Sequence, residues 1–142
     1  SGPEGALLYL EKCIGPKVED KVVLDVTNTY PGRDVNISQQ ALKQGEVEYC
    51  AGLFPGARLV RGFNSVAAYT LSSQAHRSGE LLAIPLAGND QQALNEVSEL
   101  VKNAGFDPVV AGGLDKARLF QPGSELFLNS LTGQQLRQQL SR

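Results

Sequence analysis

Two asparagines end two short apolar runs of the chain, and they are the residues best placed to do chemistry. Thr27 and Asn28 close the run at 21–28, and Asn64 closes the run at 58–64. Ligands of open α/β sheets bind just beyond the carboxyl ends of the strands. If both runs are strands, their ends therefore form one wall of a nucleotide crevice. No Gly-x-Gly-x-x-Gly turn, which would hold the phosphates of such a ligand, occurs in the chain.

Each of these residues also has a purely structural interpretation. Asn tolerates left-handed backbone and bonds locally, so a turn is the commoner role for Asn28 on sequence alone. Asn64 or Ser65 fits the N-cap of a following helix, a role worth about 1 kcal/mol, with Phe63 in the core. The cap role does not exclude a ligand contact, because helix N-termini are where anions bind.

Few other residues suggest chemistry. Asp25 lies inside the first apolar run, where a buried carboxylate needs a partner, and we expect a structural hydrogen bond rather than a general base. Arg118 is the type of residue that grips a phosphate or carboxylate, although a solvated helix face is the commoner outcome. No Ser-His-Asp set, P-loop or metal-ligand spacing occurs, so we assign no catalytic and no metal-binding residue.

The elements that must position these residues alternate between helix and strand. Apolar residues at helical spacing predict helices over 4–14, around 47–54, from 64 or 65 to about 71, over 90–104, and in two pieces after Gly112-Gly113. The β-branched and apolar runs predict strands over 22–27, 58–63, 81–87 and 107–111. Such alternation favours an α/β fold, a partial Rossmann-like domain with about four mostly parallel strands and flanking helices.

Some local details follow from single residues. Pro85 lacks a ladder donor, so its strand should lie at a sheet edge or carry a bulge. Asn89 is the expected N-cap of the helix over 90–104, with Gln92 completing a capping box. The polar tail at 134–142 is expected to fray.

Length and composition limit the class of protein. The 142 residues suit a single α/β domain over 1–142. A net charge of −2 gives no electrostatic footprint for nucleic acid, and no run is long enough for a membrane helix. No signal peptide is recognisable, and Cys13 and Cys50 lie among apolar neighbours, which predicts two buried free thiols in a cytoplasmic protein.

Four segments, in order, resemble one family. The segment KVVLDVTN at 21–28 resembles the KVVIDATN strand of the NADP oxidoreductases that use the deazaflavin coenzyme F-420, and FPGARLVRGFNS at 54–65 is similar to their LPGAKVVKAFNT. AGND at 87–90 looks like their AGDD turn, and 111–118 resembles AGPLxxAR. The same pattern occurs in the cytosolic reductase domain of the six-transmembrane metalloreductases.

This resemblance, which covers residues 6 to 121, implies a redox function. The family transfers a hydride between NADP(H) and a flavin-type ring, the cofactors carry the chemistry, and the protein orients the two rings. By resemblance, NADP and a flavin or deazaflavin are the expected ligands. The chain would correspond to the C-terminal portion of the Rossmann domain, because the Gly-rich first unit has no counterpart here. The residues expected to line the cofactor site are Thr27, Asn28, Phe63, Asn64 and Ser65.

Two further hypotheses stand beside this one. A half-sheet without its first strands exposes an edge, and exposed edges seek partners. The chain is then a non-catalytic dimerisation or interaction module, a homo-oligomer that covers the open edge by strand pairing or swapping. Alternatively, the chain is a fragment of a longer enzyme.

Overall fold

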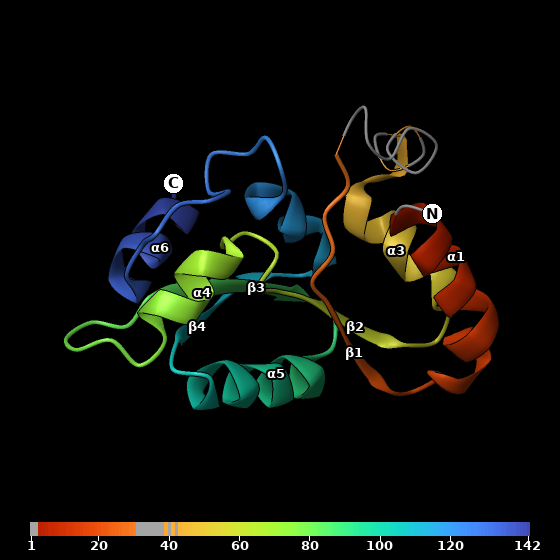
Figure 1. Ribbon diagram of the computed structural model, residues 1–142, viewed down its shortest axis with the longest axis horizontal. Helices are drawn as coiled ribbons and strands as arrows, with labels where there is room; N and C mark the ends of the chain where they lie inside the picture. Colours follow the sequence, from red (N-terminus) through yellow and green to blue (C-terminus); the bar gives the residue numbers. More distant parts are fainter. Residues whose placement is uncertain (1–2, 31–38, 40, 42) are drawn as a thin grey trace.

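The computed structural model describes residues 3–30, 39, 41 and 43–142 (Figure 1). It confirms the α/β class, with helices and strands alternating over most of the chain. The elements are α1 (Pro3–Ile14), η1 (Gly15–Lys17), β1 (Val22–Asp25), α3 (Glu46–Leu53), β2 (Arg58–Arg61), α4 (Ala68–Gln74), β3 (Ala83–Gly88), α5 (Gln91–Asn103), β4 (Asp107–Gly112), η2 (Leu114–Phe120) and α6 (Gly133–Leu140).

The described strands form one four-stranded sheet in the order β1-β2-β3-β4. β1 and β2 pair in parallel, as do β3 and β4, and this confirms the mostly parallel sheet. The junction between β2 and β3 is antiparallel and short, with Val60 opposite Gly88 and Arg61 opposite Ala87. The sheet is therefore two parallel pairs joined at one corner.

Alternate residues of the sheet feed two apolar clusters, one on each face. Val60, Ile84 and Leu86 pack with the apolar stripe of α5. Leu59, Ala83 and Ala87 pack on the other face with residues of α3, η2 and α6. Figure 1 shows the same layers, with α5 below the sheet and η2 and α6 above it. This covering of both faces explains why the strands read as continuous apolar runs.

Pro85 shows how the sheet accepts a residue without a backbone donor. β3 lies inside the sheet, but its ladder with β2 reaches only Ala87 and Gly88, so Pro85 lies outside that ladder. The pairing of β3 with β4 shifts register between Leu86 and Ala87. Of the two predicted solutions, the structure therefore uses the bulge and not the edge.

The predicted caps were wrong in two places. The N-cap of α5 is Asp90, whose side chain accepts from the Ala93 amide, whereas Asn89 accepts a hydrogen bond from the amide of Leu114. The helix after β2 begins at Ala68, with Ala67 as an N-cap that makes no side-chain bond, so neither Asn64 nor Ser65 caps it. Residues 62–67 form a turn instead, which leaves Asn64 available for contacts across the sheet.

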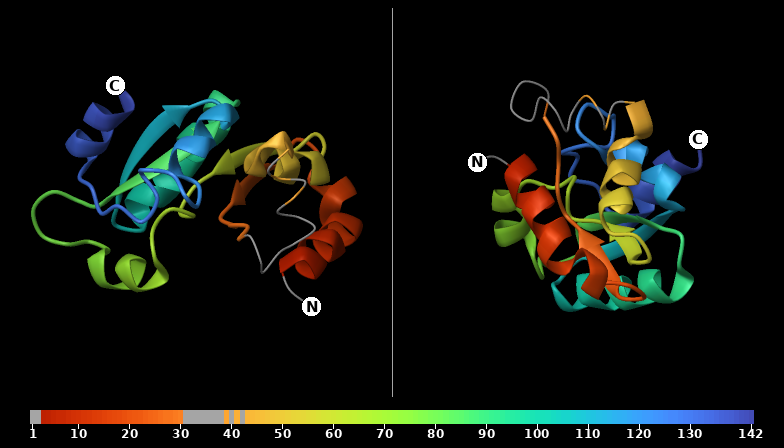
Figure 2. Two further views of the ribbon diagram at one scale, coloured as in Figure 1. Left: turned by 90° about the horizontal axis from the view of Figure 1, so that it is seen from above. Right: turned by 90° about the vertical axis from the view of Figure 1, so that its right-hand side faces the viewer.

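The tail does not fray in the way its polarity predicts. It forms α6, which begins at a capping box between Thr132 and Gln135 and buries Leu136 against the sheet. Figures 1 and 2 place α6 and α1 at opposite ends of the molecule, with α1 beside β1. None of the described helices is long and apolar enough to cross a membrane.

Candidate functional site at the ends of β1 and β2

The structure brings Asn28 and Asn64 together beyond the carboxyl ends of the parallel strands β1 and β2. The Asn28 side-chain amide donates to the backbone oxygen of Asn64 at 2.7 Å. The Asn64 amide makes a longer contact of 3.4 Å with the Asn28 side-chain oxygen. The two strand ends therefore lie close together, and whether they form the wall of a ligand site stays a prediction.

Asn64 is almost fully buried, with 4% of its surface exposed. Its Nδ2 donates to the backbone oxygen of Phe120 at 3.1 Å, and this acceptor fixes which way the amide faces. Its Oδ1 is then left buried without a hydrogen-bond donor in the part of the chain that the structure describes. An unmet buried acceptor costs about 1–3 kcal/mol, which a donor from outside the described residues would recover.

Phe63 occupies the left-handed region at φ +60°, where a side chain is strained by about 1–2 kcal/mol. Its ring packs edge-on against Phe106, with centroids 6.2 Å apart, so it joins the core on the α5 face. Backbone strain of this kind gathers at functional sites. Here it turns the chain sharply after β2, so that the next residue, Asn64, faces the end of β1.

The other two predicted site residues, Ser65 and Thr27, both lie close to the asparagine pair. Ser65 is buried, and its backbone oxygen accepts from the amide of Leu128 at 2.8 Å. Thr27 is half-buried, and its hydroxyl and amide both donate to Asp25 Oδ1, at 2.7 and 2.9 Å. Thr27 therefore lies next to the asparagine pair, while the Ser65 backbone ties the site to the loop after η2.

A buried ion network lies directly under these residues. Arg61, only 1% exposed, donates to Asp25 Oδ2 at 2.5 Å and to Glu46 Oε1 at 2.6 Å. Asp25 and Arg61 are register partners on β1 and β2, and Glu46 begins α3. Asp25 thus has the structural partner that its burial required.

The network keeps Arg61 charged. Burial by itself lowers the pKa of the Arg61 guanidinium, but the nearby carboxylates of Asp25 and Glu46 raise it, and the net pKa lies above the ordinary value. Charges buried in this way contribute little net stability. Removing one partner nevertheless lowers the stability of the protein by about 3–5 kcal/mol, because it leaves a buried charge without compensation.

The two cysteines differ, which corrects the prediction that both are buried. Cys50 is buried with its sulfur 3.8 Å from the Thr27 hydroxyl, whereas Cys13 lies on an exposed part of α1. Helical spacing alone did not reveal that α1 flanks the sheet only at its β1 edge. Burial, and next the charge of Asp25, raise the pKa of Cys50 to about 12, so this thiol is no nucleophile at neutral pH.

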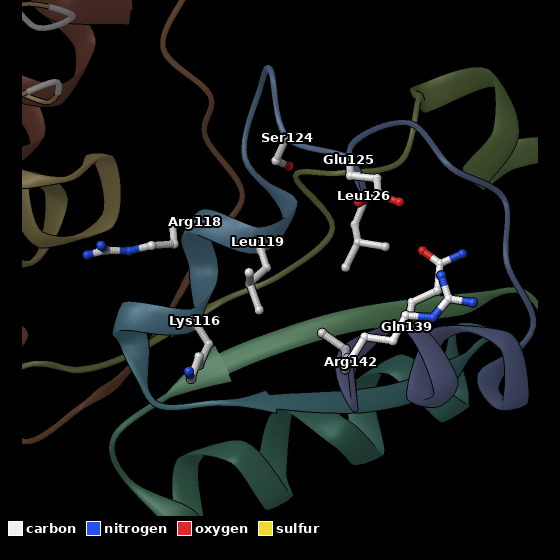
Figure 3. A pocket seen from close by; sticks show the side chains of 9 residues that line it. Lys116, Arg118, Leu119, Ser124, Glu125, Leu126, Gln139 and Arg142 are labelled. Atoms are coloured by element: carbon white, nitrogen blue, oxygen red, sulfur yellow. The ribbon is translucent and has the colours of Figure 1, made fainter.

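One hollow is lined in part by Thr27, and another lies between η2 and α6. An apolar cavity of about 170 Å³ opens between α1, β1 and α3, where Leu10, Val23 and Phe54 line it beside Thr27. A wider hollow of about 420 Å³ lies between η2 and α6. Figure 3 shows Leu119 and Leu126 pointing into this second hollow and Arg118 pointing away from it. Arg118 pairs with Glu48 at 3.3 Å, so the solvated, structural interpretation of this arginine holds.

Arg61 and Glu46 are not among the site residues predicted from the sequence. A signal for Arg61 existed, because aligning the two parallel strands from their first residues places it opposite Asp25. Glu46 carries no such signal, because its contact depends on the path of the chain between β1 and α3.

Individual proteins of known sequence resemble this chain, although no family model does. The metalloreductase STEAP3 of Rattus norvegicus is 30% identical over 111 residues, which are 78% of this chain and 21% of that protein. The metalloreductase STEAP2 of Homo sapiens is 32% identical over 98 residues, 69% of this chain and 18% of that protein. The chain thus spans about a fifth of the length of these relatives.

Solved structures share the fold. The protein SMa0349 of Sinorhizobium meliloti superposes with a TM-score of 0.69 at 26% identity, over 88% of this chain and 62% of that one. A structure described as an F420-dependent NADP reductase, from Arthrobacter sp. FB24, superposes with a TM-score of 0.63 at 21% identity, over 83% of this chain and 55% of that one. These coverages are compatible with a chain that corresponds to part of a larger domain. The chain belongs to the NADP-dependent oxidoreductase family that its motifs resemble and that includes the matching part of the STEAP metalloreductases.

Proposed function

We propose that the ends of β1 and β2 hold the nicotinamide end of NADP(H), and that the chain forms the substrate-side half of a redox cleft. The observation that carries the proposal is the contact between Asn28 and Asn64 at the ends of two adjacent parallel strands. Ligands of open α/β sheets bind at such ends.

The residues present fit a nicotinamide. Its carboxamide offers N–H donors, and Asn64 Oδ1 is a buried acceptor without a donor among the described residues. Thr27 and Asn28 are only half-buried, and the Asn28 side chain contacts Asn64. When bound, the dinucleotide supplies a hydride to a flavin or deazaflavin ring, or accepts one from it. The chain's own part is to bind, to orient the ring and to exclude water, and none of these needs an acid or base.

The site described above does not include a binding turn for the diphosphate of the dinucleotide. The turn that binds it in such folds is rich in glycine and opens a helix, and this sequence contains no Gly-x-Gly-x-x-Gly. The proposal therefore assigns the nicotinamide end to this chain and leaves the phosphate end to residues outside it.

NADPH fluorescence tests the proposal. The isolated chain is expected to quench or shift it at micromolar concentration. Asn28→Ala and Asn64→Ala should each weaken binding about tenfold, the value of one lost hydrogen bond. Asn103→Ala, which removes an exposed asparagine at the end of α5, should leave binding unchanged. If no nucleotide binds even at millimolar concentration, the proposal is wrong.

A second candidate is a non-catalytic dimerisation module, and one observation favours it. β1 is the last described strand at its side of the sheet. Around this edge Tyr9, Leu10 and Val26 are exposed, and the apolar cavity opens beside them. A second copy of the chain that pairs its own β1 along this edge would cover both.

A further inference from the structure

The backbone on either side of Asn28 is held by two different carboxylates. Before it, the amide and hydroxyl of Thr27 donate to Asp25 Oδ1, at 2.9 and 2.7 Å. After it, the amide of Thr29 donates to Glu46 Oε1 at 3.0 Å, in a buried contact. Asn28 thus lies on a three-residue span that is anchored at both ends.

A single guanidinium holds both carboxylates. Arg61 Nη1 donates to Asp25 and Nη2 donates to the same Glu46 oxygen that accepts from Thr29. All three charged side chains are at least nine-tenths buried. The planar fork of an arginine can bridge two acceptors in a fixed geometry, whereas a lysine offers one point charge. The positions of Thr27 and Thr29 therefore depend on one side chain of β2.

We propose that Arg61 is a positioning residue for Asn28: through Asp25 and Glu46 it fixes the span from Thr27 to Thr29, and so aims the Asn28 amide at Asn64. The inference rests on the proposed function for its purpose, because an aimed Asn28 matters where it meets a ligand. The network itself is a property of the protein without ligand. The two can therefore fail separately.

Two variants test the role of Arg61. Arg61→Lys keeps the charge but loses the fork. Replacing one charged residue alone can leave the other buried charges without a partner. The second variant therefore replaces all three charged side chains of the network by uncharged ones: Asp25→Asn, Glu46→Gln and Arg61→Met together. Arg58→Met is the matched control, since it removes an arginine of the same strand that lies near Asp20 and Asp90 instead.

The readout is the side-chain amide resonance of Asn28 in the folded, ligand-free protein, measured by NMR. Both test variants should shift this resonance, and the Arg58→Met control should not. In the nucleotide titration, both should weaken NADPH binding about tenfold. A test variant that folds and leaves the Asn28 resonance in place would overturn the inference.

The unmodified protein gives a second readout that does not depend on any variant folding. The backbone amides of Thr27 and Thr29 should be protected from hydrogen exchange, because each donates to a carboxylate. If they exchange as fast as exposed amides, Arg61 does not hold the span and the inference fails. If Asn28 responds as expected but NADPH never binds, the positioning role stands and the proposed function falls.

Discussion

Cys50 lies under the site, where its sulfur contacts the Thr27 hydroxyl, and it is 2% exposed. Burial, followed by the charge of Asp25, raises the pKa of this thiol from 9.0 to about 12. The folded protein therefore holds the thiol neutral at a pH where the unfolded chain has already released the proton. The stability contributed by the neutral thiol is complete below pH 9 and is lost as the pH rises toward 12.

The pH dependence of Cys50→Ala measures this effect. The difference in free energy of unfolding between the parent protein and the variant should be constant below about pH 9 and should fall by about 1.4 kcal/mol per pH unit above it. Urea denaturation at a series of pH values gives the difference, and other titrating groups cancel. In the native protein a thiol reagent should label Cys13 and spare Cys50. A difference that stays flat through about pH 10 would contradict the pKa.

At the residue scale, the sequence predicts which groups need partners better than it predicts the partners. Asp25 in an apolar run had to be paired, and it is. Its partner Arg61 can be found only by aligning the two parallel strands from their first residues, and Glu46 cannot be found in this way because its contact depends on the path of the chain to α3. The left-handed backbone of Phe63 was equally hidden, because few residues other than glycine favour that region.

At the element scale, two glycines differ in how much space a side chain would find around them. Gly62 follows β2, and a Cβ there would lie 2.5 Å from Leu86 Cδ2 of β3. Gly52 lies inside α3, and a Cβ there would meet nothing within 4 Å. The same change, glycine to alanine, should therefore have opposite effects at the two positions.

Gly62→Ala should destabilise the protein by about 1–3 kcal/mol, because the methyl group overpacks the junction of β2 and β3. Gly52→Ala should stabilise it by about 0.5–1 kcal/mol, since alanine lowers the entropy cost of forming a helix. Thermal or urea unfolding of the two variants gives both values. Equal effects, or a stabilising Gly62→Ala, would show that the close approach is not as described.

Element types could be predicted where their signal is local. The amphipathic stripe of α5 and the apolar runs of β2 and β4 gave correct types and nearly correct ends. The antiparallel junction of β2 and β3 could not be predicted, because strand direction depends on how the intervening chain crosses the sheet. The tail was misjudged because its capping box and the single buried Leu136 outweigh its polarity.

At the scale of the whole molecule, the feature with the largest consequence is the sheet edge at β1, the last described strand on its side. Val26, just after β1, is 52% exposed, and Tyr9 and Leu10 of α1 are exposed beside it. Edge strands with apolar surroundings pair with other strands unless a charge or a proline blocks them. The dimerisation candidate depends on this edge.

Sedimentation equilibrium tests self-association. The second candidate predicts a dimer of the parent chain, and a monomer for Val26→Lys, which places a charge at the edge. Leu128→Lys changes an exposed leucine far from β1 in sequence and should leave the dimer intact. A parent chain that is monomeric at every concentration would rule out the dimerisation module while leaving the nucleotide proposal untouched.

The most direct test of the central claim is NMR of the isotope-labelled chain titrated with NADPH. We expect the side-chain amide resonances of Asn28 and Asn64 to shift and to saturate together with the NADPH fluorescence. If these resonances stay in place at millimolar NADPH, or if the shifts fall only on residues remote from the ends of β1 and β2, the claim that this end of the sheet holds a nicotinamide is contradicted.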